Sequence, residues 1–164
     1  MSDLKIRLAT FDDLLVINDL YNYYVLHSTC TYQTEPSTPL ERAEWFASHG
    51  GKHPVTAVEI DGQVVGWGAL SRFHSRCAYA NTVEDSVYVH HDLHRRGVGA
   101  ALLADLVERA RAIGHHTIIG LIDGSQAASI AVHSKLGFHP CAHLKEVGCK
   151  FDRWLDVIYM QLLL

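Results

Sequence analysis

The stretch from residue 90 to residue 106 groups side chains that could bind a metal ion or an anion. It reads HHDLHRRGVGAALLADL, with three histidines, two arginines and two glycines ahead of a run of small and apolar residues. If it were helical, His90 and His94 would share a face and could ligate zinc, with Asp92 nearby. We expect a strand-to-helix connection instead, and no cluster elsewhere offers an evident third ligand. The sequence therefore predicts no metal site, and the histidines are expected on a solvated loop.

The segment RRGVGA at residues 95–100 favours an anion. It lies between a predicted strand and a predicted helix, so successive backbone N–H groups can point outward at the helix N-terminus and attract an anion together with the helix dipole. Gly97 and Gly99 allow a close approach, and Arg95 and Arg96 add positive charge. The segment predicts a phosphate site, although a tight turn without any ligand would show the same glycines.

The elements that hold this stretch follow from the periodicity of apolar residues. Leu14, Ile17 and Leu20 recur at helical steps, and Asp61-Gly62 between two apolar runs predicts a type I′ hairpin. The predicted elements are, in chain order, a strand at 5–8, a helix after Thr10, a helix from Thr38 to the Gly50-Gly51 stop, strands at 55–60, 63–70 and 78–89, a helix at 98–113, a strand at 117–122, a helix at 125–136, and a last strand or strand pair at 151–162. This order predicts an α/β fold with one mixed sheet, helices on both faces and a single domain over residues 1–164.

Composition excludes several classes of protein. The 164 residues are 48% hydrophobic and 20% charged, with a formal net charge of -4. These values are typical of a folded globular protein and argue against a general nucleic-acid binder. The four cysteines show no paired spacing, the N-terminus lacks the apolar core of a signal peptide, and no apolar run approaches the roughly 20 residues of a membrane span. We therefore expect a cytoplasmic protein with reduced thiols and no membrane or nucleic-acid partner.

Residues 94–99, HRRGVG, resemble the pyrophosphate-binding segment of the GCN5-related N-acetyltransferases (GNAT). The family pattern is Arg or Gln, two variable residues, Gly, a variable residue, and Gly or Ala. His94 departs from the first position, while both glycines match. The resemblance covers nearly the whole chain in its order of strands and helices, and it implies the GNAT fold with acetyl-CoA as cosubstrate.

Further stretches are similar to one branch of that family, the phosphinothricin, methionine sulfoximine and methionine sulfone acetyltransferases. The similar stretches are residues 31–46, 76–79, 82–103, 129–138 and 147–161. Gln126 departs from the branch, which has Asn there, although a glutamine amide could reach the same partner. The branch is commonly dimeric, so the resemblance also implies a homodimer.

The resemblance assigns roles to residues of this sequence. Glu84 is expected to be the general base, with a strand-end salt bridge as the alternative, and His133 to protonate the departing thiolate or to be a core histidine. A bulge at residues 86–89 is expected to free a backbone N–H for the thioester oxygen. The expected cosubstrate-binding residues are Val87, Tyr88, Val89, Arg95, Arg96, Gly97, Val98, Gly99, Ala100, Gln126 and Ser129.

The substrate pocket is expected to hold a cation for a substrate carboxylate. Arg76 is the first candidate and Arg72 the second, because a guanidinium binds carboxylate through two hydrogen bonds. The other candidates for substrate contact are Tyr32, Phe73, Tyr79, Glu84, Asp85 and Phe151, although aromatic residues are more often part of a core.

These residues together predict an acetyl-CoA-dependent N-acetyltransferase. Its substrate is expected to be a small amino-acid-like amine with a carboxylate, which attacks directly in a ternary complex. One alternative keeps the chemistry and changes the amine to a protein N-terminus or an aminoglycoside. A second alternative is a non-catalytic sensor that binds acyl-CoA, and fold alone does not decide between them.

Overall fold

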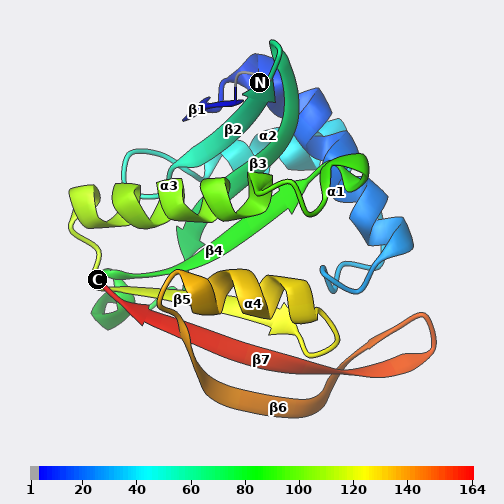
Figure 1. Cartoon of the computed structure of the whole chain (residues 1–164), viewed down its shortest axis with the longest axis vertical. Coiled ribbons are helices and arrows are strands. Elements are labelled where there is room, and N and C mark those ends of the chain that lie inside the picture. The colour runs from blue at the N-terminus through cyan, green and yellow to red at the C-terminus, as the bar shows by residue number, and fades with distance from the viewer. Residues whose placement is uncertain (1–3) are drawn as a thin grey trace.

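The computed structural model describes residues 4–164, which form one mixed sheet of seven strands (Figure 1). The strands are β1 (Leu4–Leu8), β2 (Val55–Ile60), β3 (Gln63–Arg72), β4 (Thr82–Val89), β5 (Thr117–Asp123), β6 (His139–Lys150) and β7 (Arg153–Leu163). The helices are α1 (Leu14–His27), α2 (Pro39–Ala47), α3 (Val98–Ile113) and α4 (Ala127–Lys135). The strand order is β1-β2-β3-β4-β5-β7-β6, in which only β4 and β5 run parallel to each other. The predicted α/β class with a mixed sheet is confirmed.

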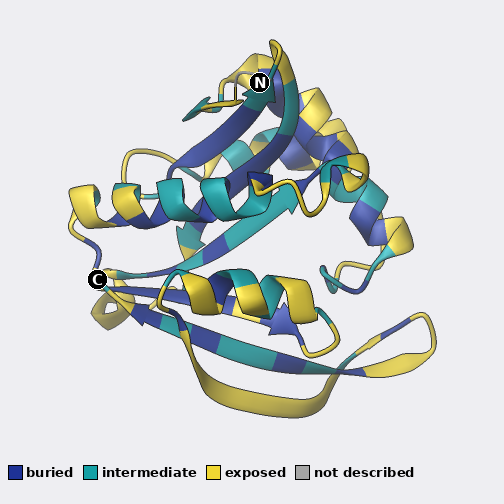
Figure 2. Ribbon diagram, in the orientation of Figure 1, coloured by how far each residue is buried: buried dark blue, intermediate teal, exposed yellow. Residues whose placement is uncertain are grey.

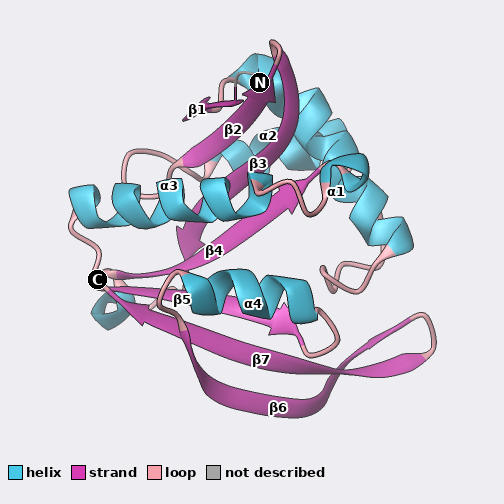
Figure 3. Ribbon diagram, in the orientation of Figure 1, coloured by secondary structure: helices cyan, strands magenta, loops and turns pink. Residues whose placement is uncertain are grey.

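Helices cover both faces of the sheet. Helices α3 and α4 lie on one face, and α1 and α2 lie behind the other (Figure 3). The alternation of side chains along β3 shows the same division, because Trp67 packs in a core with Ile17 of α1, whereas Leu70 packs in a second core with Leu103 of α3. The sides of the helices that face the sheet are buried (Figure 2).

Local signals in the sequence fix several element ends. Asp61 and Gly62 have φ values of 51° and 79°, as a type I′ turn requires, and they join β2 to β3. Thr38 and Glu41 form a reciprocal capping box at the start of α2. Gly114 ends α3 in the left-handed region with a φ of 89°. These three predictions are confirmed.

Two strand predictions need correction. Strand β4 begins at Thr82 rather than at residue 78, because Cys77–Tyr79 forms a 3-10 turn. The last strand pair begins at His139 rather than at residue 151, since β6 and β7 pair as a long hairpin. Strand β6 is an edge strand with nearly every residue exposed, so it lacks the alternation of apolar and polar residues by which a half-buried strand is recognised.

In the part of the chain that the structure describes, no helix is long and apolar enough to cross a membrane.

Candidate active site

Strands β4 and β5 part near the middle of the sheet. They pair only from Thr82↔Thr117 to Glu84↔Ile119, although β4 continues to Val89. A cavity of about 430 Å³ lies at this opening, lined by residues 84–88 of β4 and 121–123 of β5 and by side chains from α1, α2 and α4. A cavity of this size is in the range of small-molecule sites.

The edge of β4 beside the gap has free backbone N–H groups. His90 donates its N–H to the carbonyl of Val65 in β3, with an N···O distance of 2.7 Å. Because N–H directions alternate along a strand, the N–H groups of Val87 and Val89 point the other way, toward the side that β5 has left. The Val89 carbonyl faces that side too, since it accepts a hydrogen bond from the Tyr24 hydroxyl.

The predicted bulge at residues 86–89 is wrong. The register between β3 and β4 runs without a shift from Arg72↔Val83 to Gly66↔Val89. The donors are free because the neighbouring strand diverges, so β4 itself needs no extra residue.

Glu84 lies at the last paired position before the gap and lines the cavity. Burial, with a smaller contribution from the charge of Asp85, raises the pKa of its carboxyl group. Among residues 4–164, no cation forms an ion pair with Glu84, so the structure does not favour the salt-bridge alternative. A half-buried carboxylate with a raised pKa and an open path to a cavity suits a general base.

Asp85 and His133 form a buried pair beside Glu84. Nε2 of His133 lies 3.0 Å from Oδ2 of Asp85, and Nδ1 lies 2.8 Å from the carbonyl oxygen of Ser129. A carbonyl only accepts, so Nδ1 carries a proton, and the pair shares one more between Nε2 and the carboxylate. Burial alone would lower the pKa of His133, but the hydrogen bond and charge of Asp85 outweigh it and raise that pKa. Both ring nitrogens therefore have protein partners, and the second oxygen of Asp85 is buried without one.

The turn before α3 has the geometry of an anion site. Arg95 and Gly97 have φ values of 62° and 81°, and α3 begins at Val98. Such left-handed residues, followed by a helix, form a concave surface of N–H groups. Gly99 has open space beyond ordinary contact with Val89 and Val87, and Arg95 and Arg96 are exposed.

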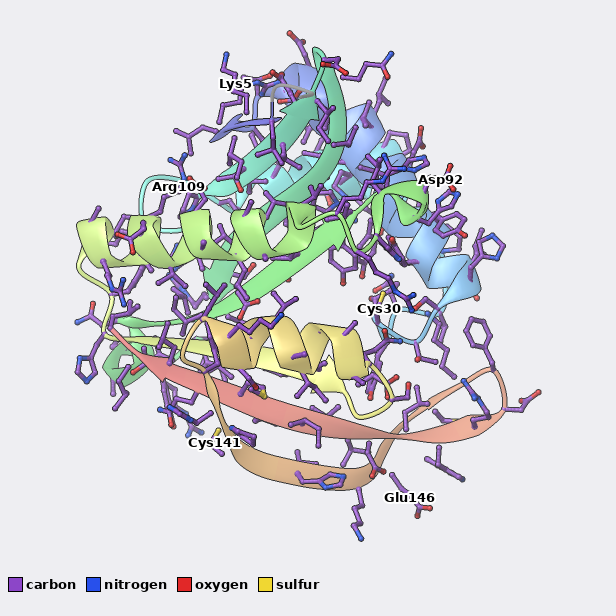
Figure 4. All side chains as sticks on the ribbon, in the orientation of Figure 1. Lys5, Cys30, Asp92, Arg109, Cys141 and Glu146 are labelled. Carbon is purple, nitrogen blue, oxygen red and sulfur yellow. The ribbon has the colours of Figure 1, made fainter. Side chains whose placement is uncertain are left out.

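The histidines of the same turn separate in space. Nε2 of His94 lies 2.6 Å from the Tyr24 hydroxyl. His94 is not part of the cluster of possible metal ligands that contains His90. His90, His91 and Asp92 place ligand atoms within 4.8 Å of one another on the turn after β4. Figure 4 labels Asp92 on this turn. The ring of His91 stacks on Tyr23 at a centroid distance of 4.1 Å, which is a contact that a loop histidine makes without any ion.

A polar network at the end of β5 holds the wall of the cavity. Asp123 is buried and accepts a hydrogen bond from Thr29 at 2.6 Å. The hydroxyl of Tyr32 donates to the Asp156 carbonyl at 2.6 Å, and a Cβ added to Gly148 would lie 2.7 Å from the Tyr32 ring. The β6–β7 hairpin therefore packs against Tyr32, which forms part of the cavity wall. The sequence predicted Tyr32 as a substrate contact.

The structure brings only some of the expected site residues together. Those that line the cavity are Tyr32, Glu84, Asp85, Val87, Tyr88, Ser129 and His133. Gln126 lies beside it and donates to Thr29 at 3.4 Å. Those outside its lining are Arg72, Phe73, Arg76, Tyr79, Phe151, Val89 and residues 95–100, of which the first four belong to the end of β3 and the exposed connection to β4.

Several lining residues were not predicted, and Arg42 is the charged residue among them that is most buried. Arg42 of α2 lines the cavity and is 4% exposed. In the sequence it stands in a short helix among Glu41 and Glu44, where a charged residue is normally solvated. Only the aromatic residue Trp45 one turn later hinted at a buried face.

A parted sheet, an anion-binding turn and a half-buried carboxylate are the parts that a group-transfer enzyme with a phosphate-bearing donor requires. The family model for "Acetyltransferase (GNAT) family" matches residues 17–138. The chain belongs to the acetyltransferase (GNAT) family, and the resemblance seen in its sequence is confirmed.

Individual relatives are similar over almost their full length. The chain is 36% identical over 160 residues to an L-methionine sulfoximine/L-methionine sulfone acetyltransferase of Salmonella typhimurium, covering 97% of this chain and 94% of the relative. It is 34% identical over 164 residues to a phosphinothricin N-acetyltransferase of Streptomyces coelicolor, covering 98% and 96%. A solved phosphinothricin acetyltransferase from Sinorhizobium meliloti in complex with AcCoA superposes with a TM-score of 0.95 at 36% identity, covering 98% of this chain and 88% of that one.

Proposed function

We propose that this enzyme transfers an acetyl group from acetyl-CoA to the amine of a small amino-acid-like molecule that carries a carboxylate. The observation that carries the proposal is the gap between β4 and β5, which opens the cavity beside Glu84 and Val87 while β4 continues to Val89, shortly before the turn at residues 95–100. The names of the similar enzymes, which act on methionine sulfoximine, methionine sulfone or phosphinothricin, support this substrate class.

Each part of the site has a task in this reaction. Acetyl-CoA, when bound, supplies a thioester whose acetyl group is transferred. The turn formed by residues 95–100 would hold its pyrophosphate, and the N–H groups of Val87 and Val89 would donate to the thioester oxygen, where negative charge develops. Gln126 and Ser129 would bind the pantetheine arm. Glu84 would accept the proton of the ammonium group, directly or through one water.

Direct attack in a ternary complex fits the chemistry of the lining. Within residues 4–164, no cysteine lines the cavity, and Cys77, the cysteine nearest in sequence to Glu84, is exposed outside it. The site therefore offers no thiol to carry the acetyl group. His133 remains our candidate for returning a proton to the departing thiolate, and it must release Asp85 or Ser129 to do so.

We also propose that the enzyme is a cytoplasmic homodimer that binds neither membrane nor nucleic acid. Support for a dimer comes from the exposed edge strand β6, whose unpaired backbone could meet a second copy. The β6–β7 hairpin also exposes Leu144, Val147, Phe151 and Trp154. The four free cysteines agree with a reducing compartment.

An amine panel scored by the release of free CoA tests the substrate class. Each amino acid would be paired with its decarboxylated amine, which keeps the nucleophile and removes the carboxylate. We expect acetylation of the amino acid with a kcat/KM at least about tenfold higher, because a guanidinium would bind the carboxylate. Arg76 and Arg72 are the candidates for this contact, and both lie outside the cavity lining in the single chain. Equal rates within the pairs would remove Arg76 and Arg72 from this role.

The same panel separates the alternatives. Faster reaction with an aminoglycoside or with a peptide N-terminus would replace the amino-acid class. No CoA release with any amine, while acetyl-CoA still binds, would support the non-catalytic sensor.

A further inference from the structure

Arg42 is a buried cation without a partner of opposite charge. Arg7, Arg109 and Arg111 each form an ion pair with a carboxylate, whereas Arg42 forms none with any residue that the structure describes. Its Nε donates to Oδ1 of Asn18 at 3.2 Å, and this is the one hydrogen bond of its guanidinium within residues 4–164. Burying a guanidinium without an anion is costly, and burial lowers the pKa of Arg42.

Aromatic rings hold the guanidinium in place. Its central carbon lies 4.5 Å from the ring centroid of Tyr21, 4.7 Å from Trp45 and 5.7 Å from Trp67. These cation–π contacts offset part of the lost hydration and fix the plane of the group. They use the faces of the guanidinium and leave its edge, which carries the N–H donors, free for an acceptor.

The free edge of the Arg42 guanidinium is accessible from the cavity. Arg42 lines the cavity, and its terminal nitrogens are not among the enclosed polar atoms that lack a partner. Within residues 4–164 these nitrogens donate to no acceptor. Buried polar groups are normally hydrogen-bonded, so an acceptor from outside the chain belongs at this position. The Nε1–H of Trp67 also lacks an acceptor, but protein atoms enclose it and close it to a ligand in the cavity.

The guanidinium of Arg42 lies away from Glu84. Its central carbon is 5.7 Å from the ring centroid of Trp67, which pairs with Tyr88 across the β3–β4 ladder, and Tyr88 is four residues beyond Glu84. At the rise of a β-strand, the Cα atoms of Glu84 and Tyr88 are about 13 Å apart. The carboxylate of an α-amino acid is attached to the same carbon as the reacting amine, so it stays near Glu84. An anion at Arg42 must be at the other end of the substrate.

We propose that the guanidinium of Arg42 binds an anionic group at the end of the substrate remote from the reacting amine. The substrate is then an amino acid whose side chain ends in a carboxylate or a phosphinate. This inference rests on the proposed function for the identity of the nucleophile, and it narrows the amines to those with a second negative charge.

The test compares L-glutamate with L-glutamine, which have the same shape and differ in the charge of the side-chain end. Phosphinothricin serves as the phosphinate probe. In the wild type, kcat/KM for glutamate and phosphinothricin should exceed that for glutamine by about 100-fold. Arg42→Met should raise KM for the two anionic amines by about 100-fold, the usual scale for loss of one partner of a buried charge pair. KM for glutamine should change by less than about threefold, because its neutral amide forms no charge pair with Arg42.

Two variants control for charge and for the loss of any arginine. Arg42→Lys keeps the cation without the two-pronged geometry, so it should restore part of the preference for the anionic amines. Arg111→Met removes an exposed arginine of α3, which pairs with Glu108, and should leave every constant unchanged. A preference for glutamine in the wild type would overturn the proposal, as would an equal loss on all three amines in Arg42→Met.

A measurement on the wild type alone decides the matter if Arg42→Met does not fold. Glutarate has the two carboxylates of glutamate and no amine, and its monoamide lacks one charge. Trp45 and Trp67 beside Arg42 supply a fluorescence signal for binding. Tighter binding of glutarate supports the Arg42 site, and equal binding overturns it. This titration needs no acetyl transfer, so it separates failure of the Arg42 site from failure of the proposed reaction.

Discussion

Replacing Glu84 by glutamine is expected to lower kcat by about 10²–10⁴-fold, the usual contribution of a general base. Glutamine keeps the shape of the side chain and removes the ability to accept a proton. The affinity for acetyl-CoA should be unchanged, since the turn at residues 95–100 and the β4 backbone are untouched. Steady-state kinetics at pH 7, with acetyl-CoA affinity measured separately, would check both expectations.

The pH profile distinguishes a lost base from a disturbed pocket. A base must be ionised to act, so wild-type activity should rise as the pH passes upward through the pKa of Glu84. Burial and Asp85 raise that pKa, which places the rise at a higher pH than for an ordinary glutamate. In Glu84→Gln this rise should be absent, and the remaining rate should increase only at alkaline pH, where free amine forms. Glu108→Gln, on the exposed side of α3, is the control. An unchanged profile in Glu84→Gln would assign the base to another group.

Replacing Asp85 by asparagine is expected to lower the free energy of unfolding more than a substitution of a surface residue does. Removing one partner of a buried charge pair costs about 3–5 kcal/mol of unfolding free energy. Asp85 and His133 are both buried, and their contact has no screening by solvent. Urea unfolding of the two proteins at fixed pH would measure the difference.

The unfolding free energy lost in Asp85→Asn should be larger at low pH than at high pH. The pKa of His133 is raised in the folded state, so folding favours the protonated ring. The stabilisation is therefore complete below the unfolded pKa of about 6.5 and is lost as the pH rises through the folded value. The gap between wild type and Asp85→Asn should be larger at pH 6 than at pH 9. Asp105→Asn, which breaks the partly exposed pair with Arg109, should show a small gap at both. An equal gap for Asp85→Asn at both pH values would mean that His133 is neutral in the pair.

Much of the fold follows from local signals in the sequence. Asp61-Gly62, the Thr38 capping box and Gly114 each act through the backbone of a few residues, so their effects are visible without tertiary structure. Strand β6 could not be predicted in this way, because it is an exposed edge strand that is held by its pairing with β7.

The candidate site was predictable where its parts are contiguous. Residues 95–100 form the turn ahead of α3 by themselves, and Glu84 stands at a strand position that the family resemblance marks. Arg42, Thr29 and Asp123 were not predicted, because their role depends on contacts between segments far apart in the chain. The bulge was predicted wrongly for a related reason: whether a donor on β4 is free depends on where β5 goes.

The separation of β4 from β5 also affects the stability of the folded enzyme when no cosubstrate is bound. A gap inside the sheet presents inner strand edges, and exposed edges are sites where chains aggregate. A cosubstrate arm lying along β4 would cover that edge, so its binding would contribute directly to the stability of the sheet. A ligand that binds only the folded state adds about 2.7 kcal/mol when its concentration is 100 times its dissociation constant. The lifetime of the folded enzyme in a cell would then follow the supply of acetyl-CoA, independently of how often the enzyme turns over.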